Sequence, residues 1–177
     1  MAVLIEAVSV VVRSDALLQR FPGGWDAFKR ITPNQTLCSD NEIVRVGFMS
    51  PQDVESFVKS LQGAGLEFLR DGEAIDIAVV DQVRGLTSKC TWLEFGQVNM
   101  SGEGQRVSTC RLVGSQLMQV VTPPSWKFEG SLSSTFGFVP SEHAEKGMKY
   151  LRHENGLDVY FNSITGEEMY VGRTGES

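Results

Sequence analysis

A run of mostly apolar side chains opens the chain over residues 3–12, and β-branched Val and Ile dominate it. β-Branched residues favour the extended backbone, so the run predicts a β-strand. Glu6 is its one charged residue. The run is too short to span a bilayer, and it lacks the basic start and small-residue cleavage site of a signal peptide. We therefore expect a strand of a soluble protein that has no membrane partner.

Two short helices are predicted next. Ser14 or Asp15 can cap a helix over residues 16–21, and a second helix over residues 25–31 ends before Pro33. Both segments are brief, so we expect packing on other elements to stabilise them.

The clearest helix signal covers residues 50–65. Ser50 is a good N-cap residue, and Pro51 suits the first helical position. Gly63 or Gly65 ends the helix. Apolar residues repeat at i, i+3, i+4 and i+7, which predicts one stripe for a sheet to cover. The stripe consists of Val54, Phe57, Val58 and Leu61.

Period-two patterns and turn residues predict further strands. Residues 35–38 and 42–49 can pair as a hairpin across a Ser-Asp-Asn turn. Residues 66–80 read as two strands joined at Asp71-Gly72, a dipeptide typical of tight hairpins. A last strand of this half covers residues 90–98.

The order strand, helix, hairpin, helix, strand predicts an α+β fold with a ferredoxin-like antiparallel sheet. Its helices would cover one face and leave the other face free. The glycine-rich loop over residues 99–106 is the best candidate for a boundary. We therefore predict a ferredoxin-like unit over residues 1–99 and a second, smaller α+β unit over residues 105–177 that packs on the first.

The second unit contains a candidate repeat of the first. Residues 47–61 align with residues 137–151 at a constant offset of 90, and the match predicts a second helix that reaches Leu151. A hairpin closed by Asn162–Gly166 would follow it. The alternative is that any capped helix leading into a strand produces such a match. The aligned pairs are Gly47/Gly137, Phe48/Phe138, Glu55/Glu145, Lys59/Lys149 and Leu61/Leu151.

Composition limits which binding partners and which cellular compartment we expect. The chain has 177 residues, 16 basic against 22 acidic, and a net charge of −6. Without a run of Lys or Arg to neutralise phosphates, nucleic acid is not an expected partner. The three cysteines lie far apart in the sequence and form no C-x-x-C pair, so we predict reduced thiols in a cytoplasmic protein and no metal site.

Catalytic motifs are missing from the sequence. No P-loop, dinucleotide-binding glycine motif, zinc-protease motif or nucleophile elbow is present. The only histidines are His143 and His153, which we interpret as solvent-facing. The sequence therefore favours a non-enzymatic role and implies no cofactor.

Two tryptophans share a spacing. Trp25 and Trp126 each stand three residues after a proline, Pro22 and Pro123. Paired recognition loops are one interpretation, and aromatic anchors that pack a loop against the fold are the commoner one.

Strand alternation predicts one polar cluster. If Val44 and Val46 face the helices, then Arg45 faces away from them, and the same alternation exposes a polar residue on each neighbouring strand. In the first strand, Val8 and Val10 would lie on the same side as Glu6. The candidate ligand-binding residues on the free sheet face are Glu6, Arg45, Asp76, Trp92 and Glu94. The alternative is that they form cross-strand pairs on a solvated face, or that the C-terminal half or a second subunit covers them as a partly polar interface.

Two functions follow from this arrangement. The first is a non-enzymatic protein that binds a partner protein, or a second copy of itself, through the free sheet face or an edge strand. The alternative is a protein that binds a small polar ligand, or an enzyme, in which Arg45 holds an anion and Trp92 stacks. Neighbouring carboxylates would then act as general acid and base.

Overall fold

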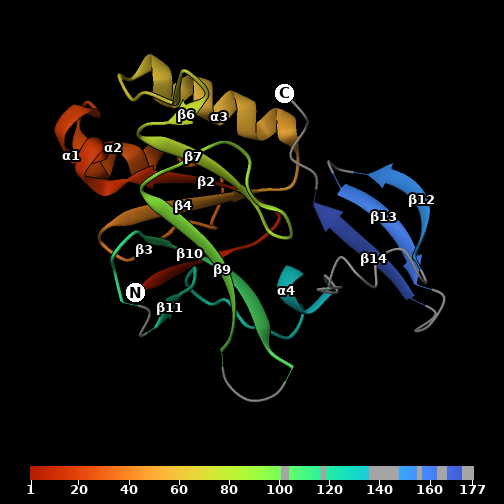
Figure 1. Cartoon of the computed structure of the whole chain (residues 1–177). Coiled ribbons are helices and arrows are strands. Elements are labelled where there is room, and N and C mark those ends of the chain that lie inside the picture. Colours follow the sequence, from red (N-terminus) through yellow and green to blue (C-terminus); the bar gives the residue numbers. More distant parts are fainter. Residues whose placement is uncertain (101–103, 117–118, 136–147, 155–156, 163–166, 173–177) are drawn as a thin grey trace.

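The chain forms a mixed α+β protein with antiparallel sheets and few helices (Figure 1). Within the described part of the chain, no helix is long and apolar enough to cross a membrane. The computed structural model describes residues 1–100, 104–116, 119–135, 148–154, 157–162 and 167–172.

A five-stranded sheet forms the centre of the fold, and all its neighbouring strands are antiparallel. The predicted hairpin that leads into the strand Ile43–Phe48 is confirmed by the pairing of Cys38 with Arg45. The strands, in spatial order, are β3 (Cys38–Ser39), β4 (Ile43–Phe48), β2 (Val8–Arg13), β7 (Ile77–Asp81) and β8 (Gly85–Leu86).

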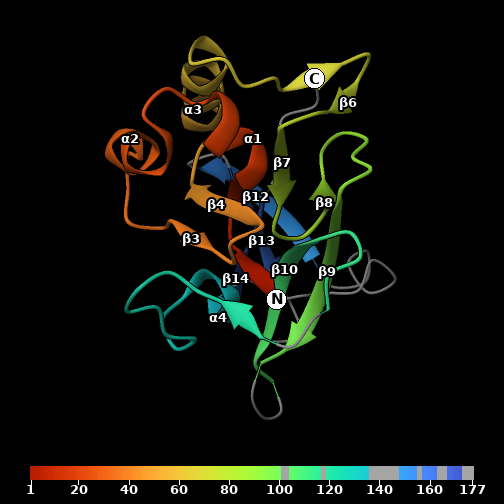
Figure 2. The same cartoon turned by 90° about the vertical axis from the view of Figure 1, so that its left-hand side faces the viewer.

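Three helices cover one face of this sheet, as Figures 1 and 2 show. They are α1 (Ser14–Arg20), α2 (Gly24–Ile31) and α3 (Pro51–Gly63). The predicted Ser50 cap of α3 is confirmed, because the Ser50 hydroxyl accepts a hydrogen bond from the Asp53 amide. The predicted Ser14 or Asp15 cap of α1 was wrong, because both residues lie inside that helix and its N-cap position is Arg13. All four residues of the predicted α3 stripe are buried. The helices and their position on one face are therefore as the apolar spacing predicts.

A second sheet covers the other face. It contains β11 (Val120–Val121), β1 (Ala2–Ile5), β10 (Arg106–Leu112) and β9 (Leu93–Asn99) in that order. A second apolar core lies between the two sheets. The face that the sequence predicted to be free is therefore buried, because apolar residues on β2 and β7 also point to that side and need cover. These residues are Val11, Ala78 and Val80.

The predicted first strand is two strands. The chain bends at Glu6-Ala7, so that β1 enters the second sheet and β2 the first. Ala7 has a φ of 52°, and Gln82 holds the bend through two hydrogen bonds of 2.8 Å, one to each main-chain group of Ala7. The bend changes which side the residues after it face. Val8 and Val10 therefore pack under the helices, and their predicted place on the side of Glu6 was wrong.

The ferredoxin-like order is not confirmed. Its sheet would need the strand around Leu93, but that strand pairs with β10 in the second sheet. The predicted turn at Asp71-Gly72 does exist, yet it joins only two-residue strands, β5 (Leu69–Arg70) and β6 (Glu73–Ala74). The division into residues 1–99 and 105–177 stays a prediction, and β10 and β11 from the second part pair with β1 and β9 from the first.

Three strands near the end of the chain form their own antiparallel sheet. They are β12 (Met148–Glu154), β13 (Leu157–Asn162) and β14 (Glu167–Gly172). The pairing of Asn162 with Glu167 confirms the strands of the closing hairpin, whose loop lies outside the described residues. The prediction of a helix that reaches Leu151 was wrong, because Leu151 lies in β12. The repeat is not confirmed, and its residues 137–147 lie outside the described part.

Candidate functional site

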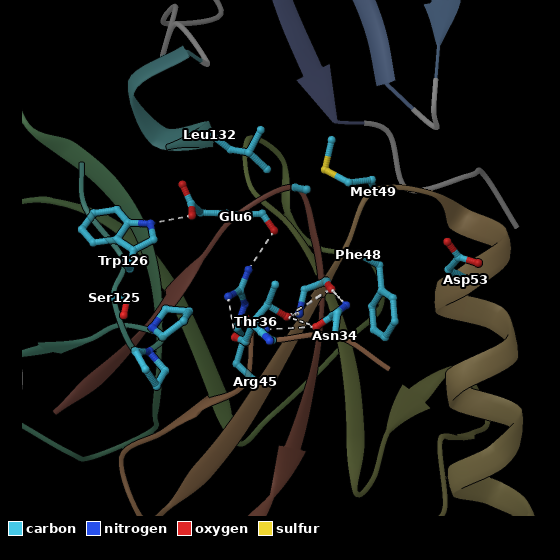
Figure 3. A pocket seen from close by; sticks show the side chains of 15 residues that line it. Glu6, Asn34, Thr36, Arg45, Phe48, Met49, Asp53, Ser125, Trp126 and Leu132 are labelled. Atoms are coloured by element: carbon cyan, nitrogen blue, oxygen red, sulfur yellow. Dashed lines mark hydrogen bonds between the residues drawn. The ribbon is translucent and has the colours of Figure 1, made fainter. Parts of the chain in front are cut away.

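A pocket of about 490 Å³ lies where the β1–β2 bend, the end of β4 and the segment from Pro123 to Leu132 meet (Figure 3). The last of these segments leads into α4 (Leu132–Thr135). The pocket has a mixed lining of charged, polar and apolar side chains. Those that matter for its chemistry are Glu6, Asn34, Thr36, Arg45, Phe48, Met49, Asp53, Trp126 and Leu132.

Arg45 is the buried cation of this site, with an exposed fraction of 2%. Its Nε donates to Ser9 Oγ at 3.0 Å, and its two terminal nitrogens donate to the carbonyl oxygens of Thr36 at 3.0 Å and Glu6 at 3.1 Å. All three acceptors are neutral. Burial lowers the pKa of Arg45, because a guanidinium loses hydration inside the protein.

Gly47 provides the space for this guanidinium. A Cβ at Gly47 would lie 2.9 Å from Arg45 Cζ and still closer to a terminal nitrogen. The Gly47 amide donates to Thr36 Oγ1 at 2.7 Å, and its carbonyl accepts from Asn34 Nδ2 at 2.7 Å. The residues before β3 are thereby held against β4, and together they form one wall of the pocket.

Glu6 fixes the opposite wall. Its exposed fraction is 7%, and one carboxylate oxygen accepts from Trp126 Nε1 at 2.8 Å. The other oxygen accepts from the Ser133 amide at 2.6 Å and the Ser133 hydroxyl at 2.7 Å. Figure 3 shows the Glu6 carboxylate turned toward Trp126 and its carbonyl oxygen turned toward Arg45. Glu6 therefore ties the 123–133 segment to the bend in the chain.

The other predicted site residues lie outside this pocket. Asp76 is 2% exposed, forms an ion pair with Arg20 and accepts from the Glu67 amide at 2.8 Å. Trp92 Nε1 donates to the Ala74 carbonyl at 3.0 Å. Of the five predicted residues, the pocket brings together only two.

The remaining predicted residue lies on the surface of the second sheet. Glu94 on β9 pairs with Arg111 on β10 at 2.8 Å, across directly opposite positions of the two strands. Such an exposed pair contributes about 0–1 kcal/mol and marks no site. The predicted cluster breaks up because Glu94 lies on β9 of the second sheet, with Trp92 just before that strand, whereas Arg45 lies on β4 of the first sheet.

Several lining residues were not predicted as site residues. Trp126 is an anchor for its loop, through its bond to Glu6, which is the commoner of the two interpretations of its spacing. Trp25 likewise stacks on Phe28, with ring centroids 6.2 Å apart. Asn34 and Thr36 carry no sequence signal, since they act only through contacts with β4.

The cysteines are poor nucleophiles in this fold. Burial raises the pKa of the Cys38, Cys90 and Cys110 thiols, so they stay protonated at neutral pH. In the part of the chain that the structure describes, no three His, Cys, Asp or Glu residues come together as metal ligands. The described pocket lining offers hydrogen-bonding groups and apolar surface.

Comparisons of this chain with protein-family models, curated proteins and solved structures found no match.

Proposed function

We propose that this protein binds a small molecule in the pocket beside Arg45. The observation that carries the proposal is a buried guanidinium in the wall of a cavity of about 490 Å³. Small-molecule sites typically have volumes of about 300–1,000 Å³ and a few fixed polar groups among apolar walls. Two of the residues that strand alternation predicts, Glu6 and Arg45, line this cavity.

The lining residues have two proposed roles in binding, apolar contact and orientation of the ligand. Phe48, Trp126 and Leu132 offer apolar surface for the body of a ligand. Arg45 orients it through hydrogen bonds, and its own neighbours hold the guanidinium still. The proposed role is binding without a catalytic step, in the cytoplasm, where the unpaired cysteines would stay reduced.

A thermal-shift screen with a blocked pocket tests this function. Met49 is 41% exposed at the pocket, so Met49→Trp adds bulk there without disturbing the core. A metabolite present at about 100 times its Kd is expected to raise the Tm of the native protein by roughly 5–10 °C. The same metabolite should leave the Tm of Met49→Trp unchanged.

The matched control is Leu18→Trp, because Leu18 is also exposed, at 66%, but lies on α1 and does not line the pocket. Its response should equal that of the native protein. A metabolite that stabilises all three proteins equally binds elsewhere, and a panel without any hit would exclude the pocket as a binding site for the compounds screened.

Self-association through an edge strand is a second proposed function. Both faces of the central sheet are covered, so edges are what remains of the predicted interface. Within the described residues β9 pairs only with β10, and it has seven residues with neither Pro nor Lys to discourage pairing. A second copy can add its own β9 to this edge in an antiparallel sense.

The oligomeric state tests the edge. If β9 pairs with β9 of a second copy, Val98→Lys on that strand should convert a dimer into a monomer, because it places a charge at the new junction. Light scattering after size exclusion measures the mass. Leu69→Lys, an exposed apolar position on the β5–β6 hairpin, should leave the dimer intact. A native protein that is monomeric at high concentration would rule the interface out.

A further inference from the structure

We propose that the ligand of this pocket carries a single anionic group, a carboxylate, which binds to Arg45. The inference rests on the proposed function and names the chemical class that the site selects. It follows from the hydrogen bonds of Arg45, from the two carboxylates in the pocket lining and from the apolar walls.

The first step is the missing countercharge. Among the residues that the structure describes, no carboxylate lies within 4.0 Å of the Arg45 nitrogens. Its printed acceptors are a hydroxyl and two carbonyl oxygens. The Glu6 carboxylate favours the charged form of Arg45 without contacting it, whereas proteins normally pair a buried charge directly with an ion of opposite sign. A ligand carboxylate beside Arg45 would supply that partner.

The second step concerns donor capacity. A guanidinium has five N–H groups in a planar fork. Three donate to Ser9, Thr36 and Glu6, and the Cys38 sulfur lies within hydrogen-bonding reach of the same side chain. This leaves donor capacity on a side chain that lines the pocket. Charge-assisted bonds from guanidinium to carboxylate are among the strongest in proteins.

The third step sets the charge of the ligand. The Glu6 carboxylate is occupied by Trp126 and Ser133, so it faces the opposite wall and does not neutralise Arg45 directly. Asp53, in the first turn of α3, is a second carboxylate in the pocket lining (Figure 3). With two carboxylates in its lining, the pocket disfavours a second negative charge on a ligand. A monoanion therefore suits the site better than a dianion.

The walls define the rest of the molecule. Trp126, Phe48 and Leu132 surround the pocket with aromatic and aliphatic surface. A monocarboxylate with an aromatic or alkyl body satisfies the walls and Arg45 together.

Matched acids and amides test the inference. The probes are 3-phenylpropionate, benzoate and octanoate, each beside its primary amide, with succinate and inorganic phosphate as probes that are mainly dianionic at a working pH of about 8. Binding to the native protein is measured by calorimetry and by the indole N–H resonance of Trp126. We expect at least one acid to bind about tenfold or more tightly than its amide, and the dianions to bind more weakly than that acid.

Two variants assign the effect to Arg45. Arg45→Met removes the charge and keeps a shorter, unbranched apolar side chain, and it should bring the affinity for the acid down to that for its amide. Arg45→Lys keeps the charge but loses the fork, and it should retain an intermediate preference for the acid. Circular dichroism and thermal unfolding confirm that both variants are folded.

The outcomes separate the two proposals. An acid and its amide that bind equally well, and are both blocked by Met49→Trp, would overturn the carboxylate inference and leave the pocket as a binding site. A preference for acids that persists in Arg45→Met would also overturn it. If none of the probes binds the native protein, the monocarboxylate class is excluded, and a hit from the metabolite screen would still support the pocket.

Discussion

Replacing Glu6 by alanine is expected to lower the free energy of unfolding by about 2–4 kcal/mol. The carboxylate accepts three hydrogen bonds, from Trp126 Nε1 and from the amide and hydroxyl of Ser133. Without it these donors lose their partner, and the Ser133 amide remains buried without a replacement. The Trp126 indole N–H resonance should also move toward its value in free tryptophan. Chemical denaturation and two-dimensional NMR measure both effects.

Two further variants give the losses of stability with which Glu6→Ala is compared. Glu6→Gln keeps one acceptor oxygen and should cost less than Glu6→Ala. Glu94→Ala removes an exposed carboxylate and its pair with Arg111, so it should change the free energy of unfolding by about 0–1 kcal/mol. A Glu6→Ala protein as stable as Glu94→Ala would show that Glu6 does not hold the 123–133 segment in place.

Replacing Gly47 by alanine is expected to lower the free energy of unfolding by about 2 kcal/mol and to weaken the binding of any ligand held by Arg45. The φ of Gly47 is outside the left-handed region, so alanine fits the backbone there. Its Cβ would nevertheless overlap the guanidinium of Arg45, which would have to leave the oxygens of Ser9, Thr36 and Glu6.

A double-mutant cycle isolates the cause. Met is too short to reach the space beside Gly47, so Gly47→Ala should cost less than about 1 kcal/mol in the Arg45→Met background. Gly96→Ala is the matched strand control, because no atom lies within 4 Å of its added Cβ. Equal costs for Gly47→Ala in both backgrounds would mean that the overlap with Arg45 is not what destabilises the variant.

Local patterns carried the prediction of the elements. The α3 helix follows from its Ser50 cap and from four apolar residues on one stripe. The side-chain alternation along β4 and β7 is confirmed as well, since Val44 and Val46 pack under the helices while Ala78 and Val80 face away from them. These features depend on neighbours within a few residues, which the sequence displays directly.

The candidate site was only partly predictable for the same reason. Arg45 and Glu6 stand out as charges within apolar strands, and the pocket does contain them. Asp76 looked equivalent, yet Arg20 neutralises it away from the pocket. Some buried charges are neutralised by a partner, and others line a cavity. The difference depends on residues distant in the sequence, such as Ser133, which lies 127 positions after Glu6.

The sequence by itself determined several local elements: the Ser50 cap and apolar stripe of α3, the alternation along β4 and β7, and the tight turn at Asp71-Gly72. Only the tertiary structure decided that the chain bends at Ala7, that a second sheet buries the supposedly free face, and that Trp126 reaches Glu6. The physical reason is that a β-strand carries its side-chain period in its own residues, whereas its partner strand, and the cover on each face, are chosen by burial and hydrogen bonding across the whole chain.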